Sequence, residues 1–410
     1  MPLSDSFNWL RRKARSGIAR LKDKGWFYWA TVVILIVVGI KLGGWLEVQD
    51  FAIIPRYRIY QAVQEQGPRH PFVQRTVVVL IGDEEYWKGE LARRVPIKRD
   101  YLAKLVSALD QADPAVIALD FDLRSQTPDG TFVQYKDYEG ETSQLLSSIT
   151  NVSKNRWIVI PKTLNFSDGF YESDSDVYDH HNFEGGNLSK GYIALPSDVR
   201  KLPLRLTVKD GSELDSFAVA IVRAANEAAL RPVKDDKELP FLRYLPADSF
   251  ERLSATKVLE KDPDTWRKIR HNIVIVGAGW STLAYGRGRP VDTYFTPLGP
   301  LPGVLLHANY VEALLDNRTS KPYAQWALNV IEGMMVLVIA VIFALLSSPI
   351  SRVIGVVLVA AALVLYGYLS LLVLGLFYDF FVPVLLVLFH AISEWIESAL
   401  SRRRRQSRSA

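Results

Sequence analysis

The chain has 410 residues, of which 49% are hydrophobic and 23% charged, and at ~150 residues per domain this length suggests two or three structural units. The composition excludes a disordered chain, a collagen-like chain and a mini-protein, and the lack of cysteine excludes disulfides and zinc–thiolate sites. The net charge of +5 comes from two short ends, residues 1–25 and 401–410, which carry +5 each and leave about −5 on the rest of the chain. A basic surface for nucleic acid is therefore not expected.

The first predicted element is a membrane-spanning helix at residues 26–46, which is apolar apart from Lys41. At ~1.5 Å per residue, a helix of this length crosses a hydrocarbon core of ~30 Å. Basic residues dominate the preceding segment, residues 1–25, and no clear small-residue cleavage site follows the apolar run. These features indicate an uncleaved anchor with a cytoplasmic N-terminus.

Residues 47–325 form a long region that alternates between short β-rich runs and helical periodicity. The apolar run at 76–81 predicts a buried strand, the apolar positions of 98–112 recur at helical spacing, and 115–119 predicts a second strand. Strand, helix and strand in this order predict a βαβ unit with parallel strands. We therefore expect an α/β domain with βαβ units and a mainly parallel sheet.

Carboxylates follow both of these strands: Asp83 and Glu84 come after the first, and Asp120 and Asp122 come after the second. Ligands of open α/β sheets bind beyond the carboxyl ends of the strands, so these four residues predict a site for a cation or a polar ligand. The same carboxylates could instead cap helices, face solvent or form ion pairs. The arginines available for such pairs are Arg93, Arg94, Arg99 and Arg124.

Later in the region, polar residues 125–190 surround one apolar run at 157–160, which predicts a strand within loops. Residues 272–276 predict another strand, which runs into Gly277 and Gly279. This glycine turn matches a phosphate-binding fingerprint only in part, because the third glycine and the following helix are missing. It favours close packing at the end of the strand.

Three more apolar segments, at about 326–346, 353–377 and 380–400, predict three membrane helices within residues 326–400. Counting crossings from a cytoplasmic N-terminus places Arg352 and the basic tail, residues 401–410, in the cytoplasm, as the positive-inside rule requires. Residues 47–325 then lie outside the cytoplasm.

Three ionisable residues, Glu332, His390 and Glu394, fall inside these apolar segments. An ionisable group within a membrane is a functional candidate by default. Glu332 and Glu394 could also lie near a helix end and reach the interface. The sequence leaves the roles of all three open.

Four stretches, taken together and in order, carry a family resemblance. They are a strand followed by an acidic pair at 77–85, Pro-x-x-Arg at 96–99, a strand ending in Asp at 118–122, and a terminal signature made of 273–277, Asp292, Thr296-Pro297 and 302–309. In these stretches residues 47–325 resemble the type-two CHASE (CHASE2) domain. This is the extracytoplasmic sensory module of bacterial histidine kinases, adenylate and diguanylate cyclases and serine/threonine kinases.

The resemblance implies a sensor with one membrane helix before the domain and three after it, in the bacterial inner membrane. The candidate ligand-binding residues are Asp83, Glu84, Arg99, Asp120, Asp122, Asp292, Thr296 and His307. No catalytic residue, metal or cofactor is predicted. Only residues 401–410 follow the last apolar segment, so we expect a stand-alone form without a kinase, a cyclase or another catalytic output domain.

Three hypotheses for function follow. The first is a membrane-anchored sensor or scaffold that binds a small ligand or a partner outside and signals through its helices to a separate protein, with the lipid bilayer and a second copy of the chain as further partners. The second is a structural subunit of a membrane complex. The third is a metal-dependent envelope enzyme that would use Asp83, Glu84, Asp120, Asp292 and His307, although His307 could simply sit at the start of a helix.

Overall fold

The computed structural model describes residues 74–319 with short gaps, and, beyond them, residues 321–322, 349–369, 376–377 and the single positions 327, 330, 334 and 338. The gaps are 125–136, 168–169, 184, 197–198, 200, 234–235, 242–243, 284–287, 297–298 and 318. The chain divides into two compact units, of which one is Gln64–Thr319, called here the α/β unit, and the other comprises Met1–Val63 and Ser320–Ala410.

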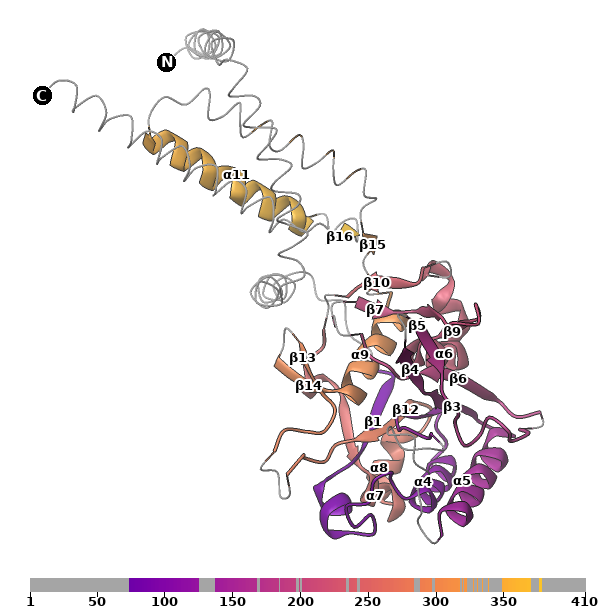
Figure 1. Cartoon of the computed structure of the whole chain (residues 1–410). Coiled ribbons are helices and arrows are strands. Elements are labelled where there is room, and N and C mark those ends of the chain that lie inside the picture. The colour runs from indigo at the N-terminus through magenta and orange to yellow at the C-terminus, as the bar shows by residue number, and fades with distance from the viewer. Residues whose placement is uncertain are drawn as a thin grey trace, which may run out of the picture. The chain divides into compact units, whose positions relative to one another are not determined.

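A six-stranded sheet with the order β11-β1-β12-β2-β3-β6 forms the centre of the α/β unit (Figure 1). All five pairings between neighbouring strands are parallel. The strands are β1 (Thr76–Ile81), β2 (Val116–Leu119), β3 (Trp157–Lys162), β6 (Leu188–Tyr192), β11 (Glu251–Ser254) and β12 (Ile273–Ala278). The inner strands read as continuous apolar runs because helices cover both faces of the sheet.

Helices on the two faces make the unit a three-layer sandwich (Figure 1). One face packs against α4 (Arg99–Gln111), α5 (Tyr138–Ser153), α7 (Ala255–Leu259) and α8 (Pro263–Ile269), with which it shares a hydrophobic core. The other face packs against α6 (Phe217–Asn226) and α9 (Gly303–Leu315). Alternate residues of a strand point to opposite faces, so Val77 and Val79 belong to the first core while Val78, which is also fully buried, points to the other side.

Short strand pairs and helical turns connect the main elements of the α/β unit. Four antiparallel pairs are β4 (Leu164–Ser167) with β5 (Phe170–Ser173), β7 (Lys201–Pro203) with β10 (Glu238–Pro240), β8 (Arg205–Thr207) with β9 (Glu213–Asp215), and β13 (Thr293–Thr296) with β14 (Gly299–Pro302). A π-helical turn lies at Glu84–Lys88, and 3-10 turns lie at Glu227–Val233 and Ala247–Ser249. The other unit contains α11 (Pro349–Leu369) and β15 (Lys321–Pro322), which pairs with β16 (Leu376–Phe377).

The predicted α/β domain with a mainly parallel sheet is confirmed. The strands expected at 76–81 and 115–119 are β1 and β2, and the helix expected at 98–112 is α4. The two strands are parallel but not adjacent, because β12 lies between them and pairs with both.

The prediction of four membrane-spanning helices is wrong for the described part of the chain. There, no helix combines the length and the apolar character that a membrane crossing needs. The run 353–377, which we interpreted as one span, is not one helix, because α11 is described over Pro349–Leu369 whereas Leu376–Phe377 form strand β16. Hydropathy alone did not reveal this change of backbone conformation.

The other three expected membrane spans lie largely or wholly outside the described residues. The spans predicted at 26–46 and 380–400 lie outside the described residues, and 326–346 is described only at single positions. The ionisable residues Glu332, His390 and Glu394 also lie outside the described residues.

Candidate functional site

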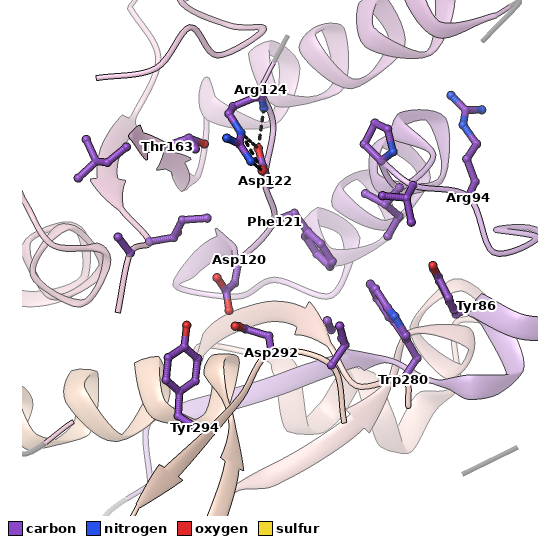
Figure 2. A pocket seen from close by; sticks show the side chains of 18 residues that line it. Tyr86, Arg94, Asp120, Phe121, Asp122, Arg124, Thr163, Trp280, Asp292 and Tyr294 are labelled. Atoms are coloured by element: carbon purple, nitrogen blue, oxygen red, sulfur yellow. Dashed lines mark hydrogen bonds and ion pairs between the residues drawn. The ribbon is translucent and has the colours of Figure 1, made fainter. Parts of the chain in front are cut away.

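A cavity of about 460 Å³ opens at the carboxyl edge of the sheet, where the order of the strands places the ends of β1, β12 and β2 side by side (Figure 2). Its lining residues are Tyr86, Arg94 to Ile97, Asp120 to Asp122, Arg124, Thr163, Leu164, Ile193, Ala194, Ala278, Trp280, Val291, Asp292 and Tyr294. This volume lies within the range of small-molecule sites, and the carboxyl edge is where open α/β sheets bind ligands.

Asp120 lies at the inner end of the cavity and follows β2 directly. Its backbone N–H donates to the Val276 carbonyl at 2.8 Å, which holds the residue in line with β12. Its side chain is 9% exposed and forms no hydrogen bond with the described residues, since the nearest partner, His307 Nε2, is 3.7 Å from Oδ1. Burial, together with the nearby charge of Asp292, raises the pKa of Asp120 to about 8.

Asp292 faces Asp120 across the inner end of the cavity (Figure 2). Its backbone adopts φ 55°, in the left-handed region, and its carbonyl accepts from the Gly303 N–H at 2.8 Å. A Cβ at position 303 would collide with the Asp292 carboxylate, so only glycine permits this approach to the first residue of α9. Burial raises the pKa of Asp292, and a hydrogen bond from Tyr294 acts in the opposite direction.

His307 lies behind Asp120 on α9 and packs edge-on against Phe217 of α6, with ring centroids 5.1 Å apart. The imidazole is 3% exposed, and burial lowers the pKa of His307 to about 4, although a backbone hydrogen bond with Ile193 opposes the change. The ring is therefore neutral at neutral pH and does not supply a positive charge to Asp120.

Asp122 and Arg124 form an ion pair on the side wall of the cavity. Arg124 Nε lies 3.0 Å from Oδ1 and 2.9 Å from Oδ2 of Asp122, and a second contact joins the guanidinium to Asp174 at 3.4 Å. The hydrogen bond to Asp122 is the main reason that the pKa of Arg124 is raised. On this wall Arg124 compensates the charge of Asp122, whereas no described cation pairs with Asp120 at the inner end.

Aromatic side chains form the outer wall. Tyr86 and Trp280 stack with their ring centroids 4.3 Å apart and their planes 7° apart, and Phe121 lies between this stack and Asp120 (Figure 2). We call Tyr86, Phe121 and Trp280 the aromatic wall. It offers apolar contact and π faces to the body of a ligand whose polar group reaches the carboxylates.

Two of the predicted carboxylates do not line the cavity. Asp83 accepts hydrogen bonds from the backbone N–H of Ser281 at 2.7 Å and from its hydroxyl at 3.1 Å, and so ties the segment after β1 to the segment after β12. Glu84 points to solvent and pairs with Lys88 one helical turn away. Of the four carboxylates that we expected at one edge of the sheet, only Asp120 and Asp122 line the cavity.

Glu85, which the sequence analysis did not single out, is the buried member of the acidic run. Its Oε1 accepts from the Thr256 hydroxyl at 2.6 Å and the Ser254 hydroxyl at 3.0 Å, and its Oε2 accepts from the Gly82 N–H at 3.0 Å. Burial acts to raise the pKa of Glu85, but these hydrogen bonds outweigh it and lower the pKa. The residue therefore joins β1 to the start of α7.

Arg99 is 1% exposed and holds three segments together. It donates to the Thr142 hydroxyl at 2.7 Å and to the Arg124 carbonyl at 2.8 Å, and its guanidinium lies 4.1 Å from the centre of the Tyr138 ring. Burial lowers the pKa of Arg99. Arg99 does not line the cavity, but it positions the segment after β2 that does.

Thr296 also lies away from the cavity lining. Its hydroxyl donates to the Gly299 carbonyl at 2.7 Å within the β13–β14 hairpin. Of the eight candidate residues, the structure brings Asp120, Asp122 and Asp292 into the cavity and places His307 directly behind it.

The set proposed for a metal-dependent enzyme converges only in part. Asp83 and Glu84 are engaged elsewhere, and the described residues contain no group of three or more His, Asp or Glu side chains that could hold a metal ion. The partial phosphate fingerprint has a packing role instead, because a Cβ at Gly277 would lie 2.6 Å from the side chain of Val304 on α9. The glycine allows close approach of β12 to that helix.

Sequence reasoning missed Tyr86, Arg94, Trp280 and Tyr294 as cavity residues. Tyr86 and Trp280 each follow a predicted strand within a few residues, which is a usable signal. Arg94 and Tyr294 carry no such signal, because long connections bring them to the cavity.

This combination defines a class of protein: a three-layer α/β domain with a ligand-sized cavity at the carboxyl edge of its sheet. The chain belongs to the CHASE2 domain family, whose model matches residues 31–346. CHASE2 domains are extracytoplasmic sensory modules. No match was found among curated proteins or among solved structures.

Proposed function

We propose that the α/β unit is an extracytoplasmic sensor that binds a small ligand in the cavity and passes the signal to a separate partner protein. The observation that carries this proposal is the side chain of Asp120, a buried carboxyl group in the cavity that has no hydrogen-bond donor among the described residues. A carboxyl group that is largely buried and opens only into the cavity keeps its hydrogen-bonding capacity for a ligand there.

Helix α9 supports a route for the signal. Its first residue, Gly303, contacts Asp292 at the cavity, and near its other end Glu312 Oε1 accepts from the backbone N–H groups of Arg75 at 2.8 Å and Thr76 at 2.7 Å. Asp316, just after the helix, pairs with Arg75 at 3.1 Å. Helix α9 thus links the cavity to the start of β1, through the contacts of Glu312 and Asp316 with Arg75.

A ligand that alters the position of Asp292 would therefore bias α9 and the flanking segments at Arg75 and Asp316. Such a shift requires that the ligand bind one arrangement of the helix more tightly than the other. We propose that a partner protein reads the change through these flanking segments. We propose that the unit lies outside the cytoplasm, so protease added to intact spheroplasts should cleave residues 74–319, and protection of these residues would contradict this location.

The binding proposal is tested by screening the full-length chain by thermal shift against amines, amino acids, sugars and carboxylates. The variant Ala278→Phe fills the cavity from β12, and Ala115→Phe, at an exposed position before β2, is the matched control. We expect at least one class to stabilise the wild type and Ala115→Phe but not Ala278→Phe. If no class binds, or if binding survives in Ala278→Phe, the cavity is not the sensory site.

A further inference from the structure

The charges around the cavity are unevenly compensated. Arg124 is paired with Asp122, and Arg94 forms an ion pair with Glu141 of α5. At the inner end, by contrast, no described cation contacts Asp120, whose side chain is 9% exposed. The inner end therefore holds carboxyl groups that no described cation compensates.

Asp120 also points into the open volume instead of into the protein. Figure 2 shows its carboxyl group facing that of Asp292, with the hydroxyl of Tyr294 directed to the same place. All three residues line the cavity. Two carboxyl groups and a hydroxyl that converge on one free space match the hydrogen-bonding needs of a group with several donors and a positive charge.

We propose that the cavity binds a small organic cation, with its ammonium group held between Asp120 and Asp292. The inference rests on the proposed sensory function and specifies the ligand class for the same cavity. The aromatic wall then receives the apolar body of the ligand.

Other classes of ligand fit the same residues less well. An anion would be repelled by either carboxyl group when it is ionised, and this repulsion is stronger in a poorly solvated space than in water. A divalent metal ion prefers a shell of six or more oxygen ligands, and the described residues hold no group of three or more metal-binding side chains. An ammonium group needs only three acceptors, and the inner end provides them.

The charge state of the inner end makes the binding dependent on pH. The groups that face Asp120 are Asp292 before β13, Tyr294 on β13 and His307 on α9. His307, with a pKa of about 4, stays neutral between pH 6 and pH 8, and burial raises the pKa of Tyr294 far above this range. Asp120, with a pKa of about 8, changes from about 1% to about half ionised over the same interval.

The test is isothermal titration of the full-length chain with three probes that share a phenyl ring and a two-carbon linker: phenethylamine, phenethyl alcohol and 3-phenylpropionate. A second set, butylamine, butanol and butyrate, removes the aromatic ring. We expect at least one amine to bind and its neutral and anionic analogues to bind at least tenfold more weakly. The affinity of that amine should rise by more than tenfold between pH 6 and pH 8, while that of the alcohol stays constant.

Two variants locate the interaction. Asp120→Asn should weaken the binding of the amine by about 30-fold or more, as expected when one partner of a buried charge pair is removed. Glu84→Gln, which removes an exposed carboxylate outside the cavity, should leave the affinity unchanged. Thermal unfolding of both variants checks that they are folded.

Three outcomes would overturn the inference. They are amines that bind no better than their alcohols, amine binding that is unaffected by Asp120→Asn, and amine affinity that does not rise with pH. Tight binding of a sugar or a carboxylate that is lost in Ala278→Phe would uphold the proposal that the cavity is a sensory site and would reject the organic cation as its ligand. If no class of ligand binds, both proposals are rejected.

Discussion

Replacing Asp120 with asparagine should stabilise the α/β unit, and the gain should grow with pH. The folded-state pKa of about 8 lies above the ordinary value of 3.8, so the folded chain binds a proton that the unfolded chain releases between these values. Stability therefore falls as pH rises through this window, since the unfolded state binds fewer protons there. Asparagine mimics the neutral carboxyl group and removes this dependence.

The magnitude follows from the two pKa values. At ~1.36 kcal/mol per pKa unit, the wild type is destabilised by about 4 kcal/mol at pH 7 but by only about 1.5 kcal/mol at pH 5, relative to an uncharged group. For a unit of this size, ~2–4 °C per kcal/mol predicts that Asp120→Asn raises the melting temperature by about 8–16 °C at pH 7 and by about 3–6 °C at pH 5.

The assay is thermal unfolding of the full-length chain at pH 5, 6, 7 and 8 in one buffer system of constant ionic strength. Asp122→Asn serves as the comparison, because it removes the ion pair with Arg124 and should lower stability slightly, by up to ~1 kcal/mol. A melting temperature that falls in Asp120→Asn, or a difference that does not change with pH, would refute the reasoning.

Three further predictions concern neighbouring residues. Glu85→Gln should destabilise the unit by about 2 kcal/mol in urea unfolding, because an amide cannot accept all the hydrogen bonds that Glu85 accepts from Thr256 and its neighbours; an unchanged midpoint would contradict this. Gly303→Ala should displace the carboxylate of Asp292 and weaken amine binding at least tenfold in calorimetry, and unaltered affinity would show that this contact is not needed. Arg99→Met should cost about 3 kcal/mol of stability in thermal unfolding, because it removes the buried donors to the Thr142 hydroxyl and the Arg124 carbonyl, and an unchanged melting temperature would contradict this.

The elements that could be predicted from the sequence are the strands that are buried along nearly their whole length. Strands β1, β2 and β12 are buried on both faces, so each reads as an unbroken apolar run. Strand β11 (Glu251–Ser254) escaped prediction because it is a short edge strand in which three of the four residues are only partly buried or exposed. The insertion of β12 between β1 and β2 also escaped, since it depends on contacts between segments far apart in the chain.

The site shows the same division. Asp120 could be predicted, because the rule for open α/β sheets places a ligand where β2 ends. The rule could not separate Glu84 from Glu85, since the π-helical turn at 84–88 decides which of them is buried. Nor could it show that Asp292 lies against Gly303, because that contact depends on how the segment before β13 folds back on α9.

The most direct test of the account is the titration of Asp120 by carbon NMR on the full-length chain with labelled aspartate, using Asp120→Asn to identify the signal. We predict a pKa near 8 in the free chain. Saturating phenethylamine, or whichever amine binds best, should move this pKa below 6, because the bound ammonium group favours the carboxylate. A free-chain pKa near 4, or a pKa that the amine leaves in place, would contradict the claim that Asp120 is the buried anchor of a cation-binding cavity.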